Sequence, residues 1–547
     1  MVAYNSVGQG QGVIEPWKHA SRAVVEHIHL HHSEMNLFQA IFKNDPLAIA
    51  IIHGKKRISY DELRHETLLT AGLLNAFGVA PGDRVALLLH DSPEFVEAFI
   101  AICSMGAIAV PINMALRPEE QRAILNNSGA KFVLVEAGLR STLLTDGFKN
   151  LRNLRIVVEV DRSDKREAGK SWMNRKSEIS SRAPIEFPEP SQNQPAFILY
   201  TSGSTGDPKG AVHRQADIFY TNDSFCRQVL NLTSNDRLFS SSRLPFAYGL
   251  GNSFSFPLLN GAASILCTEK PTPEVIKRVF SESWPTIFFG VPVVYKLLLE
   301  HHRRGEKLDC SSLRFCVSAG EALPAHLGEE WQKEFGVPVL DAIGSTEMLH
   351  MFMSNHLEDN RYGSSGKPLA GYEARLLNEN GEEVVGEEGN LWIKGDSAAM
   401  CYWEKPEETK RTFVDGWVRT GDLYKRDAGG FWFHMGRGDD CFKSSGQWVS
   451  PVEVEGVLIR NDEVHSVAVV EDFDTDGLPC ACAFIVCNRV ESDVDAVEKS
   501  LRSLADQSLP RFKRPKHYRF VDELPYTATG KVQRFKLRNE LRLERRK

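Results

Sequence analysis

Short apolar runs alternate with amphipathic stretches along the N-terminal part of the chain. The runs at 85–89, 108–112 and 131–136 are brief and rich in aliphatic residues, which is typical of buried strands. Between the first two runs, Asp91 can cap a helix, and another helix is expected to begin at Pro118. Strand, helix and strand joined by short connections predict a mostly parallel sheet that helices cover on both faces.

The pattern changes twice toward the C-terminus. A second alternating stretch spans 196–344, and the chain then becomes β-like over 363–434, where short apolar runs are broken by Gly and Asn. The last segment has a small α/β pattern of its own. We therefore expect an α/β protein with a large N-terminal body of α/β subdomains and a β-rich subdomain (1–435), followed by a small C-terminal α+β domain (436–547).

Composition and charge narrow the class of protein. The 547 residues are 42% hydrophobic and 25% charged, with a net charge of −7, which is too mild to indicate binding to nucleic acid or a membrane surface. No apolar stretch is long enough to span a membrane, and no signal-peptide pattern opens the sequence. The ten cysteines form no CxxC pair, which is typical of reduced thiols. We expect a cytoplasmic protein.

A loop rich in glycine and hydroxyl residues follows the apolar run at 196–200. It reads TSGSTGDPKG, and its backbone N–H groups and hydroxyls can surround phosphate oxygens while Lys209 adds positive charge. Because Lys209 is followed by Gly210 rather than Ser or Thr, the loop departs from the Walker pattern of P-loop kinases and GTPases. A Gly/Ser-rich surface loop would explain the composition but not the strand leading into it. The candidate phosphate-binding residues are Thr201, Ser202, Gly203, Ser204, Thr205, Gly206 and Lys209.

Further motifs follow this loop along the chain. They are IGSTE at 343–347, RTGDL at 419–423, GRGDD at 436–440 and PYTATGK at 525–531. Together with the loop, in this order, they resemble the adenylate-forming superfamily, which includes acyl-CoA and aryl-CoA synthetases, luciferases and adenylation domains of peptide synthetases. The resemblance covers residues 35–540 and rests on several motifs in register, so it is more specific than any single motif.

The resemblance implies roles for individual residues. Thr346 would contact the α-phosphate of ATP, Glu347 would hold Mg²⁺, and Asp422 would accept hydrogen bonds from the ribose. Lys531 would be the catalytic lysine, and the small domain would rotate about Asp439 to admit coenzyme A. Joining a carboxylate to a phosphate brings two anions together, so a cation and an ammonium group suit that task.

Other positions are implied to bind the nucleotide or coenzyme A. The family often has an aromatic residue stacked on adenine, where this chain has Ile343, so weaker stacking is expected. A glycine at 446 would let the pantetheine arm pass close to the backbone. The remaining nucleotide and coenzyme A positions are Gly320, Glu321, Ala322, Asp341, Ile343, Arg437 and Gly446.

The segment PFAYGLGN at 245–252 is the candidate acid-binding segment. Amino-acid-activating relatives carry an Asp after the Phe, whereas this chain has Ala247, which would leave a substrate ammonium group unpaired. This segment and GSTEMLH at 344–350 resemble the benzoate-CoA ligase branch. A benzoate-sized ring is the leading substrate, and 2-aminobenzoate (anthranilate) is the close alternative, because a Met wall and a Tyr hydroxyl can accommodate a polar group. The implied acid-binding residues are Phe246, Ala247, Tyr248, Gly344, His350 and Met351.

The acceptor of the acyl group stays open at the level of sequence. The resemblance implies an aryl-CoA ligase that uses ATP, Mg²⁺ and coenzyme A, with the acid, ATP and coenzyme A as partners. The alternative is a stand-alone adenylating enzyme that loads the phosphopantetheine thiol of a carrier protein. The presence of Glu347 and Lys531 argues against a non-catalytic scaffold. A homodimer is one assembly that the sequence leaves open.

Overall fold

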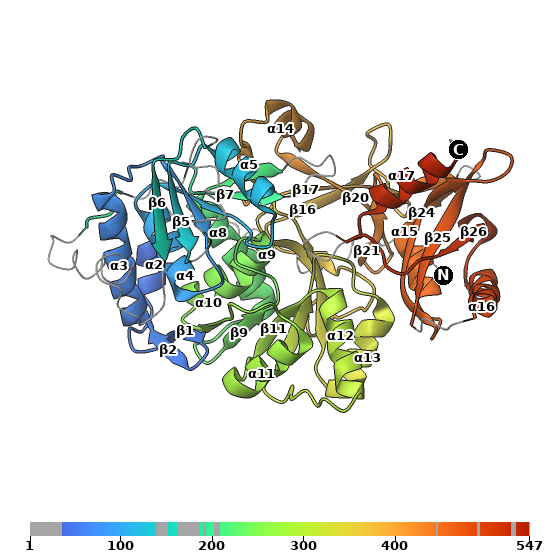
Figure 1. Cartoon of the computed structure of the whole chain (residues 1–547), viewed down its shortest axis with the longest axis horizontal. Helices are drawn as coiled ribbons and strands as arrows, with labels where there is room; N and C mark the ends of the chain where they lie inside the picture. Colours follow the sequence, from blue (N-terminus) through green and yellow to red (C-terminus); the bar gives the residue numbers. More distant parts are fainter. Residues whose placement is uncertain are drawn as a thin grey trace, which may run out of the picture.

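The structure is a computed structural model. It describes residues 35–137, 139, 151–160, 185–189, 193–201, 208–444, 447–488, 493–526 and 532–545. Figure 1 shows a large body that carries the N-terminal and middle parts of the chain, and a smaller unit beside it that carries the C-terminal part. The fold is a mixed α/β architecture, which confirms the predicted class.

The largest sheet of the body has nine strands. Its central strands run parallel, from β13 through β12, β11, β9 and β10 to β1, and antiparallel strands close both edges. In spatial order the strands are β15 (Lys367–Pro368), β14 (Met351–Ser354), β13 (Val339–Gly344), β12 (Phe315–Ser318), β11 (Ile287–Gly290), β9 (Arg237–Ser240), β10 (Ala263–Leu266), β1 (Ile49–His53) and β2 (Lys56–Ser59).

A second sheet of the body has seven strands. Strands β7, β4, β3, β5 and β6 are parallel, while β8 and β18 add an antiparallel edge. In spatial order the strands are β18 (Cys401–Tyr402), β8 (Lys209–His213), β7 (Phe197–Thr201), β4 (Ile108–Pro111), β3 (Arg84–Leu88), β5 (Phe132–Glu136) and β6 (Ile156–Val160).

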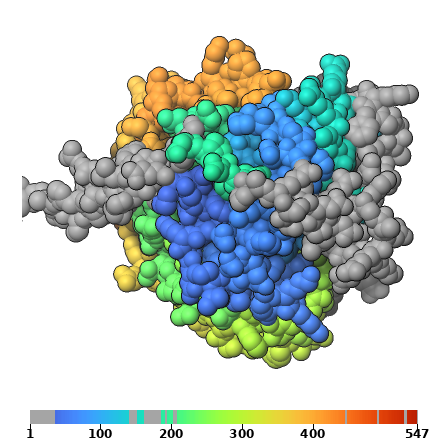
Figure 2. Space-filling view, turned by 90° about the vertical axis from the view of Figure 1, so that its left-hand side faces the viewer, coloured from blue at the N-terminus to red at the C-terminus, as the bar shows by residue number. Residues whose placement is uncertain are grey.

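One apolar core joins the two sheets, because strands of both contribute to it together with several helices. These helices are α2 (Leu37–Phe42), α3 (Tyr60–Ala76), α4 (Pro93–Ser104), α8 (Gln215–Thr221), α9 (Ala247–Leu250), the π-helical turn η2 (Gly251–Ser255) and α10 (Phe256–Leu259). Figure 2 shows the blue N-terminal segment across the middle of one face, with the orange segment above it.

Separate apolar clusters cover other faces of the sheets. Helices α11 (Pro273–Ser283), α12 (Pro292–Arg303) and α13 (Ala325–Phe335) pack on the nine-stranded sheet, and α5 (Pro118–Ser128) packs on the seven-stranded sheet. A π-helix, η1 (Asn222–Leu230), packs beside β14 in another cluster. The coverage of parallel strands by helices agrees with the expectation from the sequence.

Helix boundaries follow local signals, with one correction. Helix α5 begins at Pro118 and ends before Gly129, whose φ of 63° suits a residue without a Cβ. Helix α4 is capped by Ser92, which accepts a hydrogen bond from the N–H of Phe95, so the prediction that Asp91 caps it was wrong. Asp91 instead accepts from the N–H of Leu244 at 3.2 Å, and burial raises its pKa to about 6.

The β-rich subdomain is a five-stranded antiparallel sheet at the edge of the body. Its strands are β16 (Glu373–Leu377), β17 (Glu388–Lys394), β20 (Trp417–Arg426) and β19 (Phe413–Val414), with β21 (Trp432–Arg437) paired to β20, and α14 (Pro406–Thr412) precedes β19. Because β21 pairs with β20 as far as Arg437, this sheet reaches to the start of the C-terminal unit.

The C-terminal unit has its own core on both faces of a three-stranded sheet. Helices α15 and α16 cover one face and α17 covers the other. Its elements are β22 (Phe442–Ser444), β23 (Gln447–Val449), α15 (Pro451–Leu458), β24 (Val464–Phe473), β25 (Pro479–Cys487), α16 (Val494–Ser508), the 3₁₀ turn η3 (Arg511–Lys513), β26 (His517–Phe520) and α17 (Arg534–Glu544). No helix of the described residues is long and apolar enough to cross a membrane.

Candidate active site

The predicted phosphate loop lies between two paired strands of the seven-stranded sheet. Strand β7 ends at Thr201 and β8 begins at Lys209, and these two residues are register partners in the antiparallel pair. The pairing fixes both ends of the loop at one edge of the sheet. Five predicted phosphate ligands, Ser202, Gly203, Ser204, Thr205 and Gly206, lie outside the described residues.

Glu347, the predicted magnesium ligand, is held by a tyrosine that sequence reasoning missed. The hydroxyl of Tyr402 donates to Oε1 of Glu347 at 2.7 Å, and the ammonium of Lys209 lies 5.5 Å from the centre of the Tyr402 ring. Tyr402 is 5% exposed, and burial together with the neighbouring Glu347 charge raises its pKa. One aromatic side chain therefore contacts both the cation that ends the phosphate loop and the carboxylate.

Thr346 is fixed through its backbone by a buried histidine. Nε2 of His213 lies 2.8 Å from the carbonyl oxygen of Thr346, and Nδ1 lies 2.8 Å from Oδ2 of Asp217. The side chains of His213 and Asp217 are both fully buried, and Arg214 pairs with the other oxygen of Asp217 at 2.8 Å. Since β8 carries both Lys209 and His213, one strand positions the phosphate loop and the Thr346–Glu347 turn.

The donor set around Glu347 is compatible with magnesium. A carboxylate oxygen is a ligand that Mg²⁺ prefers, and Mg²⁺ usually combines one or two carboxylates with substrate phosphates and water. Across the part of the chain that the structure describes, no group of three His, Cys, Asp or Glu side chains could form a protein-only metal cage. A cation shared between Glu347 and bound phosphates fits these residues.

The predicted adenine side lies at the carboxyl ends of β12 and β13. Asp341 is 2% exposed, its Oδ2 accepts from the N–H of Leu323 at 3.4 Å, and burial raises its pKa well above the ordinary value. Gly320 has a φ of 89°, which favours glycine, and the turn it begins contains Glu321 and Ala322. Ile343, at the end of β13, is half-buried. The ends of parallel strands in such sheets are where ligands bind.

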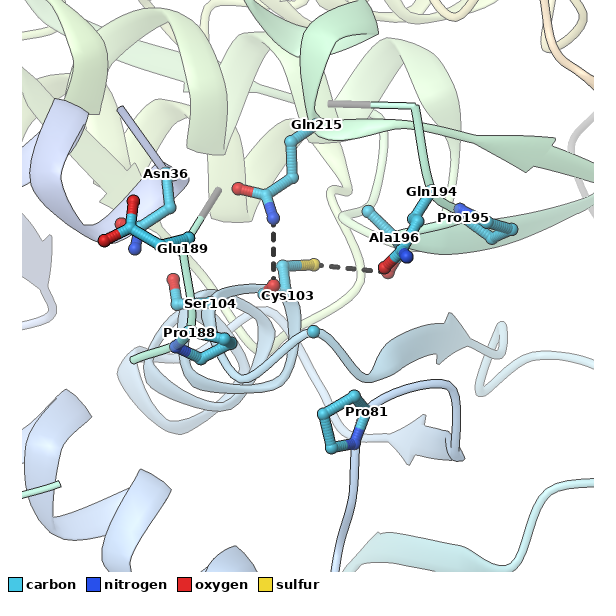
Figure 3. A pocket seen from close by; sticks show the side chains of 11 residues that line it. Asn36, Pro81, Cys103, Ser104, Pro188, Glu189, Gln194, Pro195, Ala196 and Gln215 are labelled. Carbon is cyan, nitrogen blue, oxygen red and sulfur yellow. Dashed lines mark hydrogen bonds between the residues drawn. The ribbon is translucent and has the colours of Figure 1, made fainter. Parts of the chain in front are cut away.

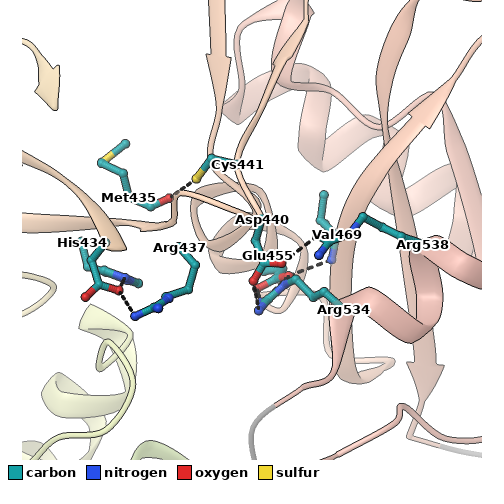
Figure 4. A network of polar contacts seen from close by, with 10 residues as sticks. His434, Met435, Arg437, Asp440, Cys441, Glu455, Val469, Arg534 and Arg538 are labelled. Atoms are coloured by element: carbon teal, nitrogen blue, oxygen red, sulfur yellow. Dashed lines mark hydrogen bonds and ion pairs between the residues drawn. The ribbon is translucent and has the colours of Figure 1, made fainter. Parts of the chain in front are cut away.

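The predicted ribose ligand, Asp422, lies in a polar network between β20 and β21. Nη1 of Arg437 is 3.2 Å from Oδ1 of Asp422, and Nε2 of His434 is 3.5 Å from the same oxygen. Figure 4 shows His434 and Arg437 close together on one side of this network. The Asp422 charge raises the pKa of Arg437, and the charges of Glu347 and Asp439 also contribute to this increase.

The predicted hinge, Asp439, lies between two anchored neighbours. The N–H of Gly438 donates to the carbonyl of Gly421 in β20 at 2.9 Å. On the other side, Oδ1 of Asp440 accepts from Arg538 of α17 at 2.7 Å, and Figure 4 shows Arg538 and Arg534 beside Asp440. Gly438 is thus attached to the body and Asp440 to the C-terminal unit.

The predicted acid-binding segment begins at the start of α9. Phe246 is its half-buried N-cap, and Ala247 is 7% exposed. The hydroxyl of Tyr248 donates to the carbonyl oxygen of Val317 at 3.0 Å, with the carbonyl oxygen of Gly290 at 3.3 Å. Because both neighbours are acceptors, the proton of this hydroxyl is already used in a hydrogen bond within the protein.

His350 lies under this segment as a neutral, enclosed ring. It is 2% exposed, and its Nε2 is 3.4 Å from the carbonyl oxygen of Tyr248. Burial lowers its pKa to about 3, so the ring carries no charge near neutral pH. A Cβ at Gly251 would lie 2.3 Å from the His350 ring, and one at Gly344 would lie 2.4 Å from the His350 carbonyl oxygen. Glycine is required at both positions because the ring and the backbone of His350 lie too close for a Cβ.

Several predicted residues remain to be placed. Met351 begins β14, is 2% exposed and belongs to an apolar core cluster. Lys531 and Gly446 lie outside the described residues, although Arg534 and the hairpin β22–β23 flank them. Tyr402 and His213 were missed because their contacts with the turn at 346–347 join distant parts of the sequence, and Asp217 was missed because it acts through His213.

A small cavity of about 70 Å³ lies elsewhere in the body (Figure 3). Figure 3 shows Gln215 reaching toward Cys103, whose carbonyl oxygen accepts from Nε2 of Gln215 at 2.9 Å. None of the predicted site residues lines this cavity. It is separate from the candidate active site.

Comparison with known families identifies the family of the chain. The model of the AMP-binding enzyme family matches residues 38–403, and the model of the AMP-binding enzyme C-terminal domain matches residues 453–531. The chain belongs to the AMP-binding enzyme family. The family assignment confirms the resemblance that the ordered motifs predicted.

Individual members of the family resemble the chain over most of its length. Benzoate–CoA ligase of Thauera aromatica is 38% identical over 491 residues, covering 88% of this chain and 90% of that protein. The crystal structure of the anthranilate CoA ligase AuaEII with anthranoyl-AMP has a TM-score of 0.87 and 34% identity, covering 95% of this chain and all (100%) of that one. A benzoate CoA ligase structure from Burkholderia xenovorans LB400 has a TM-score of 0.82 and 35% identity, with 92% and 100% covered.

Proposed function

We propose that the protein is an AMP-forming aryl-CoA ligase. In the first step a benzoate-type carboxylate attacks the α-phosphorus of ATP, which gives an aryl-AMP anhydride and diphosphate. In the second step the thiol of coenzyme A attacks the acyl carbon, AMP leaves, and the thiol proton passes to solvent. The observation that carries this proposal is the convergence of Lys209, Tyr402 and Glu347 at the phosphate loop, in a family with aryl-CoA ligases at 38% identity.

Residues of the body would bind and orient ATP. Asp422 offers a carboxylate to the ribose hydroxyls, and the turn after β12 borders the adenine site. Glu347 would hold Mg²⁺, which when bound supplies positive charge to the phosphates as they approach the carboxylate. Thr346 would contact the α-phosphate, with its backbone held by His213.

We take the C-terminal unit as residues 436–547 and the body as residues 1–435. The C-terminal unit would adopt one orientation for adenylation, in which Lys531 acts, and a second orientation for thioester formation, reached by rotation at Asp439. We propose that the Lys531 ammonium stabilises the adenylation transition state and that rotation at Asp439 then exposes a path for coenzyme A past Gly446. The anchors at Gly438 and Asp440 support a pivot at the residue between them. Lys531→Ala is expected to abolish adenylation while sparing transfer from supplied aryl-AMP, and equal loss of both steps would contradict the role.

The hydrogen bonding of Tyr248 favours an aromatic acid with a hydrogen-bond donor as its substituent. The Tyr248 hydroxyl donates to Val317 and can only accept a further hydrogen bond, which suits the amino group of 2-aminobenzoate. The His350 ring is neutral and therefore cannot form an ion pair with the acid. We therefore propose benzoate and 2-aminobenzoate as the acids to test first.

A screen of substituted benzoates tests the proposed function. With ATP, Mg²⁺ and coenzyme A, the protein should release diphosphate and form aryl-CoA, which mass spectrometry detects. Phenylalanine serves as the amino-acid control and should give no diphosphate, because Ala247 offers its ammonium no partner. If benzoate supports diphosphate exchange but no aryl-CoA forms, the acceptor would be the thiol of a carrier protein rather than coenzyme A.

Two further expectations are part of the proposal. All ten cysteines are free thiols, which supports a reducing, cytoplasmic location. A homodimer is proposed as the assembly, and sedimentation velocity at several protein concentrations tests it, with a single monomeric species as the contradicting result.

A further inference from the structure

Tyr402 is placed to control the orientation of the Glu347 carboxylate. It lies in β18, whose residue Tyr402 pairs with Ala211 of β8, so the sheet that carries the phosphate loop also carries this tyrosine. The backbone N–H of Trp403 adds a hydrogen bond to the carbonyl of Gly210 at 2.7 Å. The position of the ring is therefore set by the strand that begins at Lys209.

The Tyr402 side chain has little freedom to move. Its ring packs edge-on against Phe413 at 5.4 Å between centroids, and its backbone N–H donates to the hydroxyl of Thr409 at 3.0 Å. A buried phenol with a fixed ring presents its hydroxyl in one direction, and that direction ends at Oε1 of Glu347. The backbone of Glu347 is held as well, because its carbonyl accepts from the N–H of Ala399 at 2.7 Å.

We propose that Tyr402 is a positioning residue that aims the Glu347 carboxylate at the divalent cation bound with ATP. Its hydroxyl donates to Oε1 and so holds the carboxylate in one orientation, from which Glu347 would bind the cation. Hydrogen-bonded partners of metal-ligating carboxylates orient the ligand and raise metal affinity in this way. Lys209, over the ring of the same tyrosine, couples this orientation to the phosphate loop. The inference rests on the proposed function, because it assigns Glu347 to the metal.

Binding of Mn²⁺ with a non-cleavable ATP analogue, α,β-methylene-ATP, tests the inference without turnover. Electron paramagnetic resonance follows the loss of free Mn²⁺ signal on titration of the full-length protein. Tyr402→Phe removes only the hydroxyl and is expected to raise the Kd for Mn²⁺ by roughly ten- to a hundredfold. Tyr60→Phe is the matched control, since it also removes a buried hydroxyl, one that donates to Ala262 at 2.9 Å in the core. An unchanged Kd in Tyr402→Phe would overturn the inference.

A double-mutant cycle separates positioning from loss of structure. In a Glu347→Gln background, Tyr402→Phe should cause no further loss of Mn²⁺ affinity, because the hydroxyl acts through that carboxylate. If the losses of Mn²⁺ affinity in the two single variants add fully in the double variant, the inference is contradicted. This holds even if Tyr402→Phe is less stable to unfolding than wild type. In turnover, Tyr402→Phe should raise the Mg²⁺ concentration for half-maximal adenylation without changing the rate of transfer from supplied aryl-AMP to coenzyme A.

The two proposals fail in different ways. If the wild-type protein makes no aryl-CoA from any acid, the proposed function fails, and the Mn²⁺ titrations still measure the effect of Tyr402. If the wild-type protein makes aryl-CoA and Tyr402→Phe binds Mn²⁺ as tightly as wild type, only the role of Tyr402 fails.

Discussion

Arg437 and Asp422 face each other across β21 and β20, with Nη1 of the arginine 3.2 Å from Oδ1 of the aspartate. Arg437 lies two residues before the proposed hinge at Asp439. The carboxylate proposed to bind ribose is therefore held by a residue at the start of the C-terminal unit. This ion pair joins the proposed ribose site to the segment of the proposed hinge.

Asp422→Asn should weaken ATP binding more than acid binding. The amide keeps the shape of the side chain but loses the charge that strengthens hydrogen bonds from the ribose and Arg437, each worth roughly 1.5–3 kcal/mol. We expect the KM for ATP to rise by about tenfold or more, with the KM for benzoate within about twofold of wild type. Diphosphate release at varied ATP measures this. Equal increases in both constants would argue against a ribose role.

His213→Ala should destabilise the body. It leaves the buried Asp217 carboxylate and the Thr346 carbonyl without their imidazole partner, which costs roughly 3 kcal/mol. Thermal unfolding of the variant should begin several degrees earlier than in wild type. His65→Ala, at an exposed position of α3, is the control and should leave the transition unchanged. If His213→Ala unfolded at the same temperature as wild type, this hydrogen-bond network would contribute little to the stability of the body.

His350 should make the body sensitive to acid. Its folded-state pKa is about 3 and its unfolded value is about 6.5, so the unfolded chain takes up a proton that the folded state excludes. The stability contribution is complete above pH 6.5 and is lost as the pH falls toward 3, by about 1.4 kcal/mol at pH 5.5. Urea unfolding at pH 7.5 and 5.5 should show a smaller difference for His350→Gln than for wild type. An equal difference in the two proteins would contradict the assignment.

Tyr248→Phe should change the choice of acid. The variant loses the oxygen lone pairs that can accept from an ortho amino group, while the aromatic wall remains. We expect kcat/KM for 2-aminobenzoate to fall roughly tenfold relative to benzoate. Competition between the two acids, read out as the ratio of the two CoA thioesters, measures this directly. An unchanged ratio would place the substituent away from Tyr248.

Asp439→Pro should separate the two half-reactions. Proline fixes φ at the one residue between the anchors at Gly438 and Asp440, so rotation of the C-terminal unit is blocked. Aryl-AMP should still form, while thioester formation should fall by at least about a hundredfold, as single-turnover assays can show. Asp439→Ala is the control that keeps rotation possible. Normal thioester formation in Asp439→Pro would place the pivot elsewhere.

Sequence reasoning succeeded where the deciding signals are local. Pro118 and Gly129 mark the two ends of α5 because each suits one backbone position. It failed at α4, where Asp91 and Ser92 are both good caps and a long-range contact with Leu244 takes Asp91 away. Local rules cannot anticipate a partner that comes from a distant loop.

At the candidate site the roles of the motif residues stay predictions, and the structure adds contacts that no motif indicated. The ordered motifs predicted Thr201, Lys209 and Asp422, and the structure sets Lys209 beside Glu347 through Tyr402. Tyr402 stands in a two-residue strand, so no periodicity identified it. His213 could have been suspected only as a buried histidine that follows the phosphate loop, since its contact with Thr346 spans 133 residues. Both contacts depend on the pairing of strands that sequence patterns do not specify.

The close approach of Gly251 to His350 limits how the enzyme could be redesigned. No side chain fits at 251 while an imidazole stands opposite, so these two positions can only change together. A smaller residue at 350 would release the glycine to become alanine and, in the proposed acid pocket, would leave room for a bulkier ring substituent. Libraries that vary either position alone would therefore miss the combinations with a reshaped acid pocket.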